Sequence, residues 1–375
     1  MMHLSSLWEK QSFLTCDVAI IGAGITGLSA AASLKEESPE LDVIVLERGL
    51  LPSGASTKNA GFACFGSVSE LLNDIASLGD NGAFELVQKR ITGLNKTKER
   101  LGEDAIDLQI NGGYELVFEK DSHILGQVEK VNQLLRPLFH DTIYQIANHK
   151  IRQFGFEEVA SLIENKYEGQ LDTGKLIKTL WSYCSSLGIR IHTSCEVTNI
   201  HQEDGGIVLE CHNGSFSARK IGICTNAFSN DLLEKPVDQT PGRGMVLSIV
   251  PERPLQIRGT FHYEEGYYYF RDYYGKLIFG GGRNLDLAGE ATKEFGISDR
   301  IKEKLIHDLQ RFILPEEKFQ IETEWSGIMA FGENKEPIIA QVSSNIVIGT
   351  RLGGMGVAIG SLVGEKVAKE ILKLL

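Results

Sequence analysis

The sequence of 375 residues contains no apolar run long enough to cross a membrane. A membrane-spanning helix needs roughly 18 or more predominantly apolar residues in succession. The chain also lacks an excess of basic residues, because 38 lysines and arginines stand against 50 aspartates and glutamates, a formal charge of −12. A surface that follows nucleic-acid phosphates needs the opposite balance. We therefore predict neither a membrane span nor a nucleic-acid partner.

Cysteine is scarce, and its spacing is irregular. The six cysteines form no CxxC pair, and the nine histidines form no HxxxH or HExxH motif. Structural and catalytic metal sites usually show such spacings. Residues 1–15 include Glu9 and Lys10 and lack the apolar centre of a signal peptide. We predict no metal site, reduced thiols and a cytoplasmic location.

The chain has no low-complexity tract, no internal repeat and no linker rich in proline or serine. Apolar residues make up 42% of it and charged residues 23%, as in ordinary globular proteins. A chain of this length can hold two domains around substantial cores. With these classes excluded, the composition is that of an ordinary globular enzyme or binding protein.

The most informative motif is the glycine-rich turn Gly22-Ala-Gly24-Ile-Thr-Gly27, which directly follows the apolar run Val18–Ile21. In such a turn the first glycine permits the sharp bend, the second lets a pyrophosphate approach the backbone, and the third lets the helix pack on the strand. The helix N-terminus offers free N–H groups to phosphates. A second apolar run ends at Glu47, whose carboxylate can accept hydrogen bonds from a ribose diol. The pattern predicts a dinucleotide site.

A second glycine-rich segment, Gly353-Gly-Met-Gly356-Val357, follows the apolar run Ile346–Ile348 near the end of the sequence and precedes a helical pattern. It predicts that the chain returns to the cofactor with another helix N-terminus. That arrangement favours a flavin over a nicotinamide, because a helix N-terminus near the pyrimidine ring stabilises the negative charge of reduced flavin.

Between these motifs the hydrophobic pattern predicts alternating helical and β-rich segments. Helices are expected at 69–78, 83–103, 123–138, 173–187 and 297–312, a hairpin at 108–118, and β-rich stretches at 189–224, 244–282 and 319–329. The order predicts interleaved domains. Nucleotide-type segments at 1–66, 150–225 and 330–375 would bracket a second domain formed by 67–149 and 226–329.

These motifs resemble the FAD-dependent D-amino-acid oxidase superfamily, and within it the branch of glycine/sarcosine oxidases and γ-glutamylputrescine oxidases. The resemblance also rests on Ser53-Gly-Ala-Ser-Thr-Lys58-Asn-Ala-Gly-Phe62 and Cys224-Thr-Asn-Ala227. It implies an α/β fold with a doubly wound, Rossmann-like FAD-binding domain and a substrate domain built on an antiparallel sheet. It further implies that the small residues of 53–62 let the backbone lie close to the flat flavin ring.

The resemblance assigns FAD contacts to these residues: Gly22, Ala23, Gly24, Ile25, Thr26, Gly27, Glu47, Arg48, Gly54, Ala55, Ser56, Lys58, Asn59, Ala60, Gly61, Val197, Cys224, Thr225, Asn226, Gly353, Gly354, Met355, Gly356 and Val357. Cys64 lies just beyond the flavin loop and raises the possibility of a covalent link. In the family the covalent cysteine, where present, lies near the C-terminal flavin segment, and no cysteine follows Cys224 here. Non-covalent FAD is therefore expected.

The expected substrate site agrees with the family at one position and departs from it at another. Tyr267 aligns with a tyrosine that helps to bind a substrate carboxylate, and on a strand it shares a face with Tyr269. Met329 stands where the family has the arginine that clamps that carboxylate. Arg283, Arg351 and Lys58 are the candidate replacements; otherwise the substrate lacks the carboxylate.

The predicted activity is oxidation of the C–N bond of a small amine or amino acid, with hydride transfer to the flavin and oxygen or a quinone as electron acceptor. Two alternatives stay open. One is a 2-hydroxy-acid dehydrogenase or oxidase, which needs a base such as His262 to remove the hydroxyl proton. The other is a non-catalytic FAD-binding subunit, because intact cofactor motifs beside a missing arginine would also fit such a protein.

Overall fold

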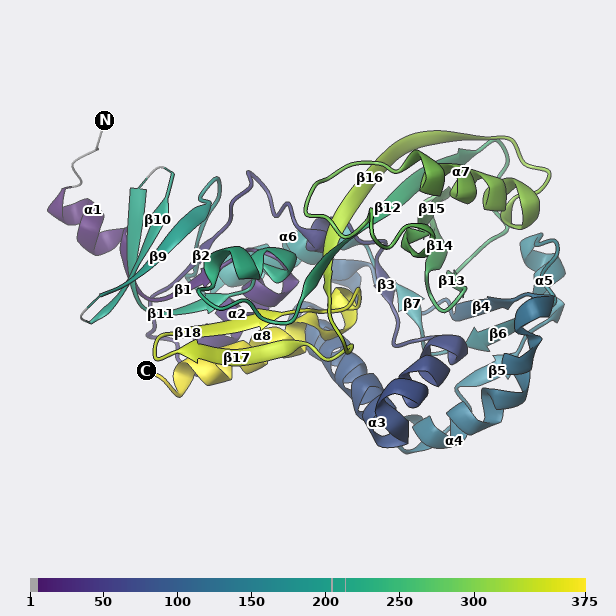
Figure 1. Ribbon diagram of the computed structural model, residues 1–375, viewed down its shortest axis with the longest axis horizontal. Coiled ribbons are helices and arrows are strands. Elements are labelled where there is room, and N and C mark those ends of the chain that lie inside the picture. The colour runs from purple at the N-terminus through teal and green to yellow at the C-terminus, as the bar shows by residue number, and fades with distance from the viewer. Residues whose placement is uncertain (1–5, 204, 213) are drawn as a thin grey trace.

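The computed structural model describes residues 6–203, 205–212 and 214–375, whose strands form two eight-stranded sheets and one two-stranded sheet. Figure 1 shows the two large sheets at opposite ends of the molecule, with the long helix α3 beneath them. The α-helices are α1 (Leu7–Ser12), α2 (Ile25–Glu37), α3 (Val68–Leu101), α4 (Val128–Phe139), α5 (His149–Phe154), α6 (Thr173–Ser186), α7 (Asp299–Asp308) and α8 (Gly356–Leu372). The helical segments of other types are η1 (Ala55–Thr57), η2 (Asp104–Ile106), η3 (Glu119–Gln127), η4 (Asn226–Leu232), η5 (Arg283–Leu285) and η6 (Leu309–Ile313).

The first sheet has the strand order β17-β18-β11-β1-β2-β8, and β9 and β10 extend it from β11. Its strands are β1 (Thr15–Ile21), β2 (Val43–Leu46), β8 (Arg190–His192), β9 (Val197–Glu203), β10 (Gly206–Cys211), β11 (Gly214–Ile223), β17 (Ile338–Ser343) and β18 (Ile346–Thr350). The central pairs are parallel, with β1 between β2 and β11. This sheet confirms the predicted doubly wound architecture.

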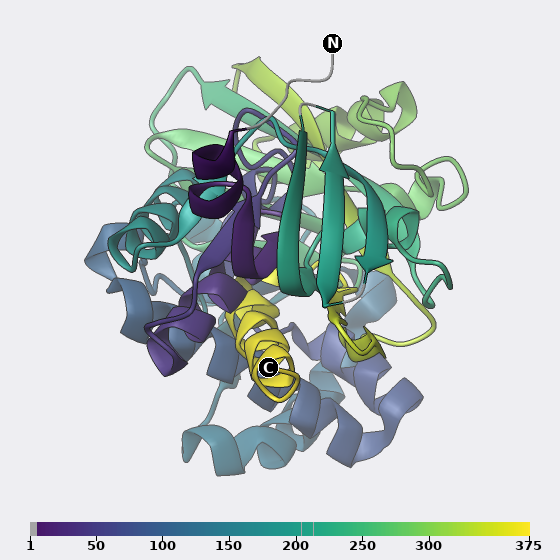
Figure 2. The same ribbon diagram turned by 90° about the vertical axis from the view of Figure 1, so that its left-hand side faces the viewer.

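Two apolar layers cover the first sheet. Because residues alternate across a strand, Val18 and Ile20 face one layer and Ala19 and Ile21 the other. The first layer is formed by α2, α6 and α8, and the second mainly by β9 and β10, which pack against the strands of the sheet. In Figure 2 the teal strands of this second layer stand above the yellow helix α8.

The second sheet has the order β16-β12-β15-β14-β13-β4-β6-β5 and is antiparallel except where β4 runs parallel to β13. Its strands are β4 (Gly113–Val117), β5 (Tyr144–Ile146), β6 (Ser161–Asn165), β12 (Thr240–Pro251), β13 (Thr260–Tyr263), β14 (Tyr268–Tyr273), β15 (Lys276–Gly281) and β16 (Phe319–Phe331). The two-stranded sheet pairs β3 (Phe62–Ala63) with β7 (Gly169–Gln170). The predicted antiparallel second domain is thus confirmed in its architecture.

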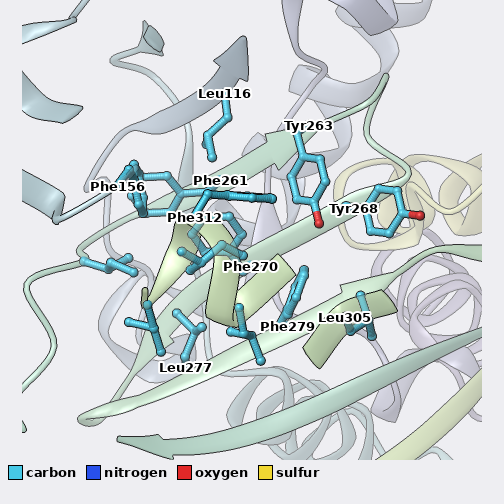
Figure 3. Close-up of a cluster of buried hydrophobic side chains, with 14 of the residues drawn as sticks. Leu116, Phe156, Phe261, Tyr263, Tyr268, Phe270, Leu277, Phe279, Leu305 and Phe312 are labelled. Carbon is cyan, nitrogen blue, oxygen red and sulfur yellow. The ribbon is translucent and has the colours of Figure 1, made fainter. Parts of the chain in front are cut away.

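Aromatic pairs fix which face of the second sheet is core. Phe261 stacks on Phe270 with ring centroids 4.8 Å apart, and Tyr263 stacks on Tyr268 at 4.6 Å. Each pair joins residues directly opposite on β13 and β14, and all four side chains lie in the buried cluster of Figure 3. His262 points to the opposite face, because neighbouring residues of a strand alternate.

Two expectations about local structure are wrong. The stretch 108–118 is not a hairpin: Gln109 bridges to Gln170, and β4 pairs with β13 on one side and β6 on the other. All residues of β4 are buried, so the backbone N–H and C=O groups on both of its edges need hydrogen-bond partners. The turn at Gly112 leads into β4 but does not join it to a paired strand before it. The domain boundary at 150 is also misplaced, because β6 belongs to the second sheet.

The prediction of two successive helices before the second sheet is confirmed. They form α3, whose helical geometry is interrupted at Gly79, where φ is 73°. A left-handed backbone is easily adopted by glycine and ends a regular helix there. No helix in the described part of the chain is long and apolar enough to cross a membrane.

Candidate functional site

A cavity of about 440 Å³ is lined by residues from both large sheets. One end is formed by the turn between β1 and α2, the end of β2 and the start of β9. The other end is formed by the loop 54–61, the segment 353–358 and the face of the second sheet that lies opposite its aromatic core. The two glycine-rich motifs, which are more than three hundred residues apart in sequence, thus meet at one cavity.

The turn between β1 and α2 depends on close backbone contact. Gly22 has φ of 101°, and a Cβ atom there would lie 2.8 Å from the Cys224 carbonyl oxygen. A Cβ atom on Gly27 would lie 1.8 Å from the Gly22 carbonyl oxygen, which no side chain can tolerate. Both positions therefore require glycine. The turn leaves the N-terminus of α2 against the cavity, where its free N–H groups can bind phosphate.

Glu47 is buried where β2 ends and ties this turn to the neighbouring loop. One carboxylate oxygen accepts a hydrogen bond from the Ala23 N–H at 3.1 Å. The other accepts from the Gly49 N–H at 2.9 Å and from the Ser53 hydroxyl at 3.3 Å. Because these donors come from the protein, the carboxylate is held in a fixed orientation while it lines the cavity. That is the position in which it can accept from a ribose diol.

At the end of the cavity formed by the turn after β1, two buried polar atoms lack hydrogen-bond partners within the described chain. They are Oγ1 of Thr26, in the first turn of α2, and Oδ1 of Asn226, after β11. Both residues line the cavity. Buried polar groups are normally hydrogen-bonded, so these atoms fit a ligand with hydroxyl and phosphate groups. The residues at this end of the cavity are therefore suited to a dinucleotide.

Small residues form the wall at the other end of the cavity, where the sequence predicts the flavin ring. Gly353 and Gly354 have positive φ angles of 57° and 83° and lead into α8. The first turn of that helix lines the cavity at Gly356 and Val357. In the facing loop, Gly61 also has positive φ, and the residues before Lys58 form only the short turn η1. Backbone rather than side chain thus faces the space that a flat ring would need.

Most residues that the sequence predicted for cofactor binding line this cavity. They are Gly22, Gly24, Ile25, Thr26, Glu47, Arg48, Gly54, Ala55, Ser56, Lys58, Asn59, Ala60, Gly61, Val197, Cys224, Thr225, Asn226, Gly353, Gly354, Met355, Gly356 and Val357. Ala23 and Gly27 do not line it. Ala23 instead donates its N–H to Glu47, and Gly27 packs against the backbone of Gly22.

Arg351 is not placed in the cavity, although the sequence made it a candidate for substrate binding. Its guanidinium is buried and bonded to the Asp238 carboxylate, to the Asn334 side chain at 2.9 Å and to the Glu336 carbonyl at 2.9 Å. These partners use its donors to hold the loop before β17 against the end of β18. Arg351 is therefore a structural residue and not a substrate clamp.

Tyr267, Tyr269 and Arg283 lie together at the substrate end of the cavity. The guanidinium carbon of Arg283 is 3.7 Å from the centre of the Phe331 ring and 5.4 Å from that of Tyr267. Its contacts among the described residues are these rings, and no carboxylate there forms an ion pair with it. Burial lowers the pKa of Arg283 from its ordinary value, but an arginine remains charged. Met329 lines the same space as an apolar wall.

The face assignment on β14 agrees with the sequence pattern. Tyr269 lines the cavity, whereas Tyr268 is fully buried in the core behind the sheet. Tyr267, just before the strand begins, lies on the cavity side. Burial raises the pKa of Tyr269 to about 12, so its hydroxyl stays protonated and can donate a hydrogen bond.

His262 also lines the cavity, but it is poorly suited to act as a base. Burial alone would lower the pKa of His262. The Glu168 carboxylate, whose oxygen lies 3.7 Å from Nε2 of His262, raises that pKa, and the net result is a pKa above the ordinary value. Glu168 in turn accepts hydrogen bonds from the Phe65 and Gly66 N–H groups. The imidazole is therefore held in its protonated form at higher pH than a free histidine.

Several cavity residues were not predicted from the sequence. Phe331 lies two positions beyond Met329 on β16 and therefore on the same face, so extending the predicted strand would have found it. Glu70, Asn73, Glu265 and Lys335 come from α3, from the turn after β13 and from the loop before β17. They carry no sequence signal, because only the tertiary fold brings those three segments together.

A family model described as FAD dependent oxidoreductase matches residues 17–370. The chain belongs to this family. The residues that line the cavity described above, with their glycine-rich turns and two helix N-termini, fit FAD. The expected cofactor is thus confirmed as FAD.

Relatives in the family span most of the chain at low identity. The γ-glutamylputrescine oxidoreductase of Escherichia coli is 25% identical, with 96% of this chain and 84% of the relative covered. The sarcosine oxidase subunit beta of Rhizobium meliloti is 23% identical over 86% of this chain and 76% of its own. The crystal structure of glycine oxidase from Geobacillus kaustophilus superposes with a TM-score of 0.76 at 20% identity, covering 96% and 95% of the two chains, and confirms the fold.

Tyr267 and Tyr268 form a matched pair for testing which face of the sheet meets the substrate. We expect Tyr267→Phe to weaken donor binding or slow flavin reduction by about 0.5–1.5 kcal/mol, the size of one neutral hydrogen bond. Tyr268→Phe should leave both nearly unchanged, because its ring lies in the core. Stopped-flow flavin reduction measures both variants. A sensitive Tyr268 beside a silent Tyr267 would show that the assigned faces are reversed.

Proposed function

We propose that this family member oxidises the C–N bond of a small amine or amino acid that carries an anionic group. The observation that carries the proposal is Arg283, a partly buried cation that lines the cavity without a carboxylate partner among the described residues. A buried charge without a partner is costly, and an anionic substrate group would satisfy it. The names of the relatives, which act on glycine, sarcosine and γ-glutamylputrescine, support the C–N bond.

Bound FAD supplies a two-electron acceptor for the hydride on the carbon next to nitrogen. The protein residues have the task of orientation. Arg283 would hold the anionic group at a position fixed by its stacking on Phe331. Tyr267 and Tyr269 would offer hydroxyl groups from the same side of the cavity, and Met329 would exclude water from it. The substrate amine would lose its proton to solvent on binding, and the imine would hydrolyse after release.

A 2-hydroxy acid is less well supported as the substrate. Its oxidation needs a base for the hydroxyl proton, and His262 is the histidine that lines the cavity among the described residues. The neighbouring Glu168 raises the pKa of His262 and so favours its protonated form, which cannot accept that proton. Amine oxidation needs no such base, because the amine can lose its proton before hydride transfer.

An anaerobic screen of flavin reduction tests the proposed reaction. Purified holoprotein is mixed with amines, N-methyl amino acids, D-amino acids and 2-hydroxy acids, and bleaching of the flavin absorption is followed. We expect rapid bleaching by an amine or amino acid. The reduced protein is then mixed with oxygen or with a quinone, and the compound that restores the flavin absorption is the electron acceptor. Bleaching by 2-hydroxy acids alone would overturn the proposal, and no bleaching by any donor would favour a non-catalytic subunit.

We also propose that FAD is bound without a covalent link. Of the cysteines that line the cavity, Cys64 and Cys224 are buried, and burial raises the pKa of Cys224 to about 12 and that of Cys64 well above its ordinary value. Neither is a ready thiolate nucleophile. Acid precipitation should therefore leave the yellow colour in the supernatant, where mass spectrometry identifies intact FAD. Colour retained in the pellet would show a covalent bond.

The Arg283→Met variant tests the anion site. It keeps an unbranched apolar side chain but removes the guanidinium and its charge, so we expect the KM for the true substrate to rise by the equivalent of about 2–5 kcal/mol with FAD content retained. Arg311→Met serves as the control, because Arg311 is exposed and pairs with Glu158 away from the cavity. Unchanged kinetics in Arg283→Met would shift the anion site to Lys58.

A further inference from the structure

Two cysteines meet at the adenosine end of the cavity. Cys195 lies two residues before β9, and Cys211 is the last residue of β10. Their sulfur atoms are 2.9 Å apart, and both side chains are only partly buried. The register between β9 and β10 shifts at a β-bulge between Glu210 and Cys211. A bulge redirects a side chain relative to the regular ladder, and here the irregularity coincides with the cysteine that meets Cys195.

The distance between these sulfur atoms is unusual for two free thiols. A disulfide bond has a sulfur–sulfur length of about 2.0 Å, so the pair must close by less than about 1 Å to be joined. The two residues already lie on adjacent segments of one antiparallel hairpin. Bond formation therefore needs only a local adjustment and no change in strand pairing.

The two thiols also differ in chemistry from the other four. The pKa of Cys195 is lowered because its sulfur shares a hydrogen bond with Cys211, whose own pKa is raised. A thiolate is the form that attacks an oxidant or a disulfide. The remaining cysteines, Cys16, Cys64, Cys184 and Cys224, are buried, and burial raises their pKa values. These four buried thiols can be compared with Cys195 and Cys211 in the same sample, because they should react with an oxidant more slowly.

Cys195 is connected directly to the FAD site. Its backbone N–H donates to the Glu47 carbonyl oxygen at 2.8 Å, and the N–H of Ser194 donates to the Gly49 carbonyl oxygen at 2.9 Å. Cys195 and Val197 line the cavity. The segment before β9 thus supports the backbone of Glu47 on one side and forms the cavity wall on the other. A cross-link from Cys195 to Cys211 would fasten this segment to β10.

We propose that Cys195 and Cys211 are a reversible thiol–disulfide pair that controls how firmly the protein holds FAD. Oxidation breaks the two S–H bonds, removes two protons and two electrons from the thiols and forms one sulfur–sulfur bond. With hydrogen peroxide as oxidant, the electrons and protons pass to the peroxide and two molecules of water leave. A dithiol reductant reverses the step. The disulfide slows FAD release, because the wall next to Glu47 can no longer move away from β10.

The test uses wild-type holoprotein treated either with a small excess of hydrogen peroxide or with dithiothreitol. Free thiols are alkylated, the protein is digested, and mass spectrometry locates each cysteine. We expect a cross-linked Cys195–Cys211 peptide, two hydrogens lighter than the sum of its parts, while the four buried cysteines stay reduced. Absence of that peptide at peroxide doses that oxidise no other cysteine would overturn the proposal.

Release of FAD gives a second readout that is independent of turnover. The increase in flavin fluorescence after dilution should be severalfold slower for oxidised than for reduced wild-type protein. In Cys211→Ser, whose altered residue does not line the cavity, the two treatments should give equal rates. Cys16→Ser, which changes a buried thiol elsewhere, should behave as wild type. Equal rates in oxidised and reduced wild-type protein would overturn the effect on FAD, and a peroxide effect that persists in Cys211→Ser would assign it to another group.

Discussion

The contact between the Gly27 position of α2 and the Gly22 carbonyl is the constraint on which the cofactor site depends. Helix and strand approach so closely there that a Cβ atom would lie 1.8 Å from the oxygen. The approach sets the direction of α2, so that its first turn meets the cavity. It also brings the Ala23 N–H within 3.1 Å of Glu47. The first turn of α2 and the Glu47 carboxylate are thus both positioned by one turn.

A second close contact brings the C-terminal segment to the same place. A Cβ atom on Gly364 of α8 would lie 2.6 Å from the Thr26 carbonyl oxygen of α2, and one on Gly360 would lie 2.8 Å from the Ile25 side chain. The two helices therefore pack with their backbones close together. Because α2 is already fixed by its own turn, this packing determines where the first turn of α8 meets the cavity. The packing of α8 on α2 therefore places the two glycine-rich motifs at the same cavity.

The second sheet supplies the rest of the cavity through simple alternation. The stacked pairs Phe261–Phe270 and Tyr263–Tyr268 bury one face. His262 and Tyr269, which lie opposite each other on the same two strands, must then face the cavity. A slip of β13 by one residue would place His262 in the aromatic core and turn Phe261 and Tyr263 toward the cavity. The large cost of such an exchange keeps the cavity-facing side chains in register.

The sequence could predict those features that depend on local backbone rules. Glycine at Gly22 and Gly27, the acid at Glu47 and the alternation around Tyr268 follow from turn geometry and strand period. The pairing of β4 could not be predicted in this way, because a turn sequence at 111–113 does not reveal that its two flanks have different partners. Glu70 and Lys335 were missed for the same reason, since they reach the cavity from segments far apart in sequence.

The two candidate arginines show why residue type alone does not decide function. Arg351 has positive φ of 61° and is surrounded by acceptors from Asp238, Asn334 and Glu336, so its charge is used within the fold. Arg283 follows the positive-φ glycines at the end of β15, which turn its side chain onto the Phe331 ring. A ring face fixes the position of a guanidinium but does not satisfy its N–H donors. Those donors are the ones that our proposal assigns to an anionic substrate group. The difference in partners, more than position in the sequence, separates this candidate from an arginine that stabilises a loop.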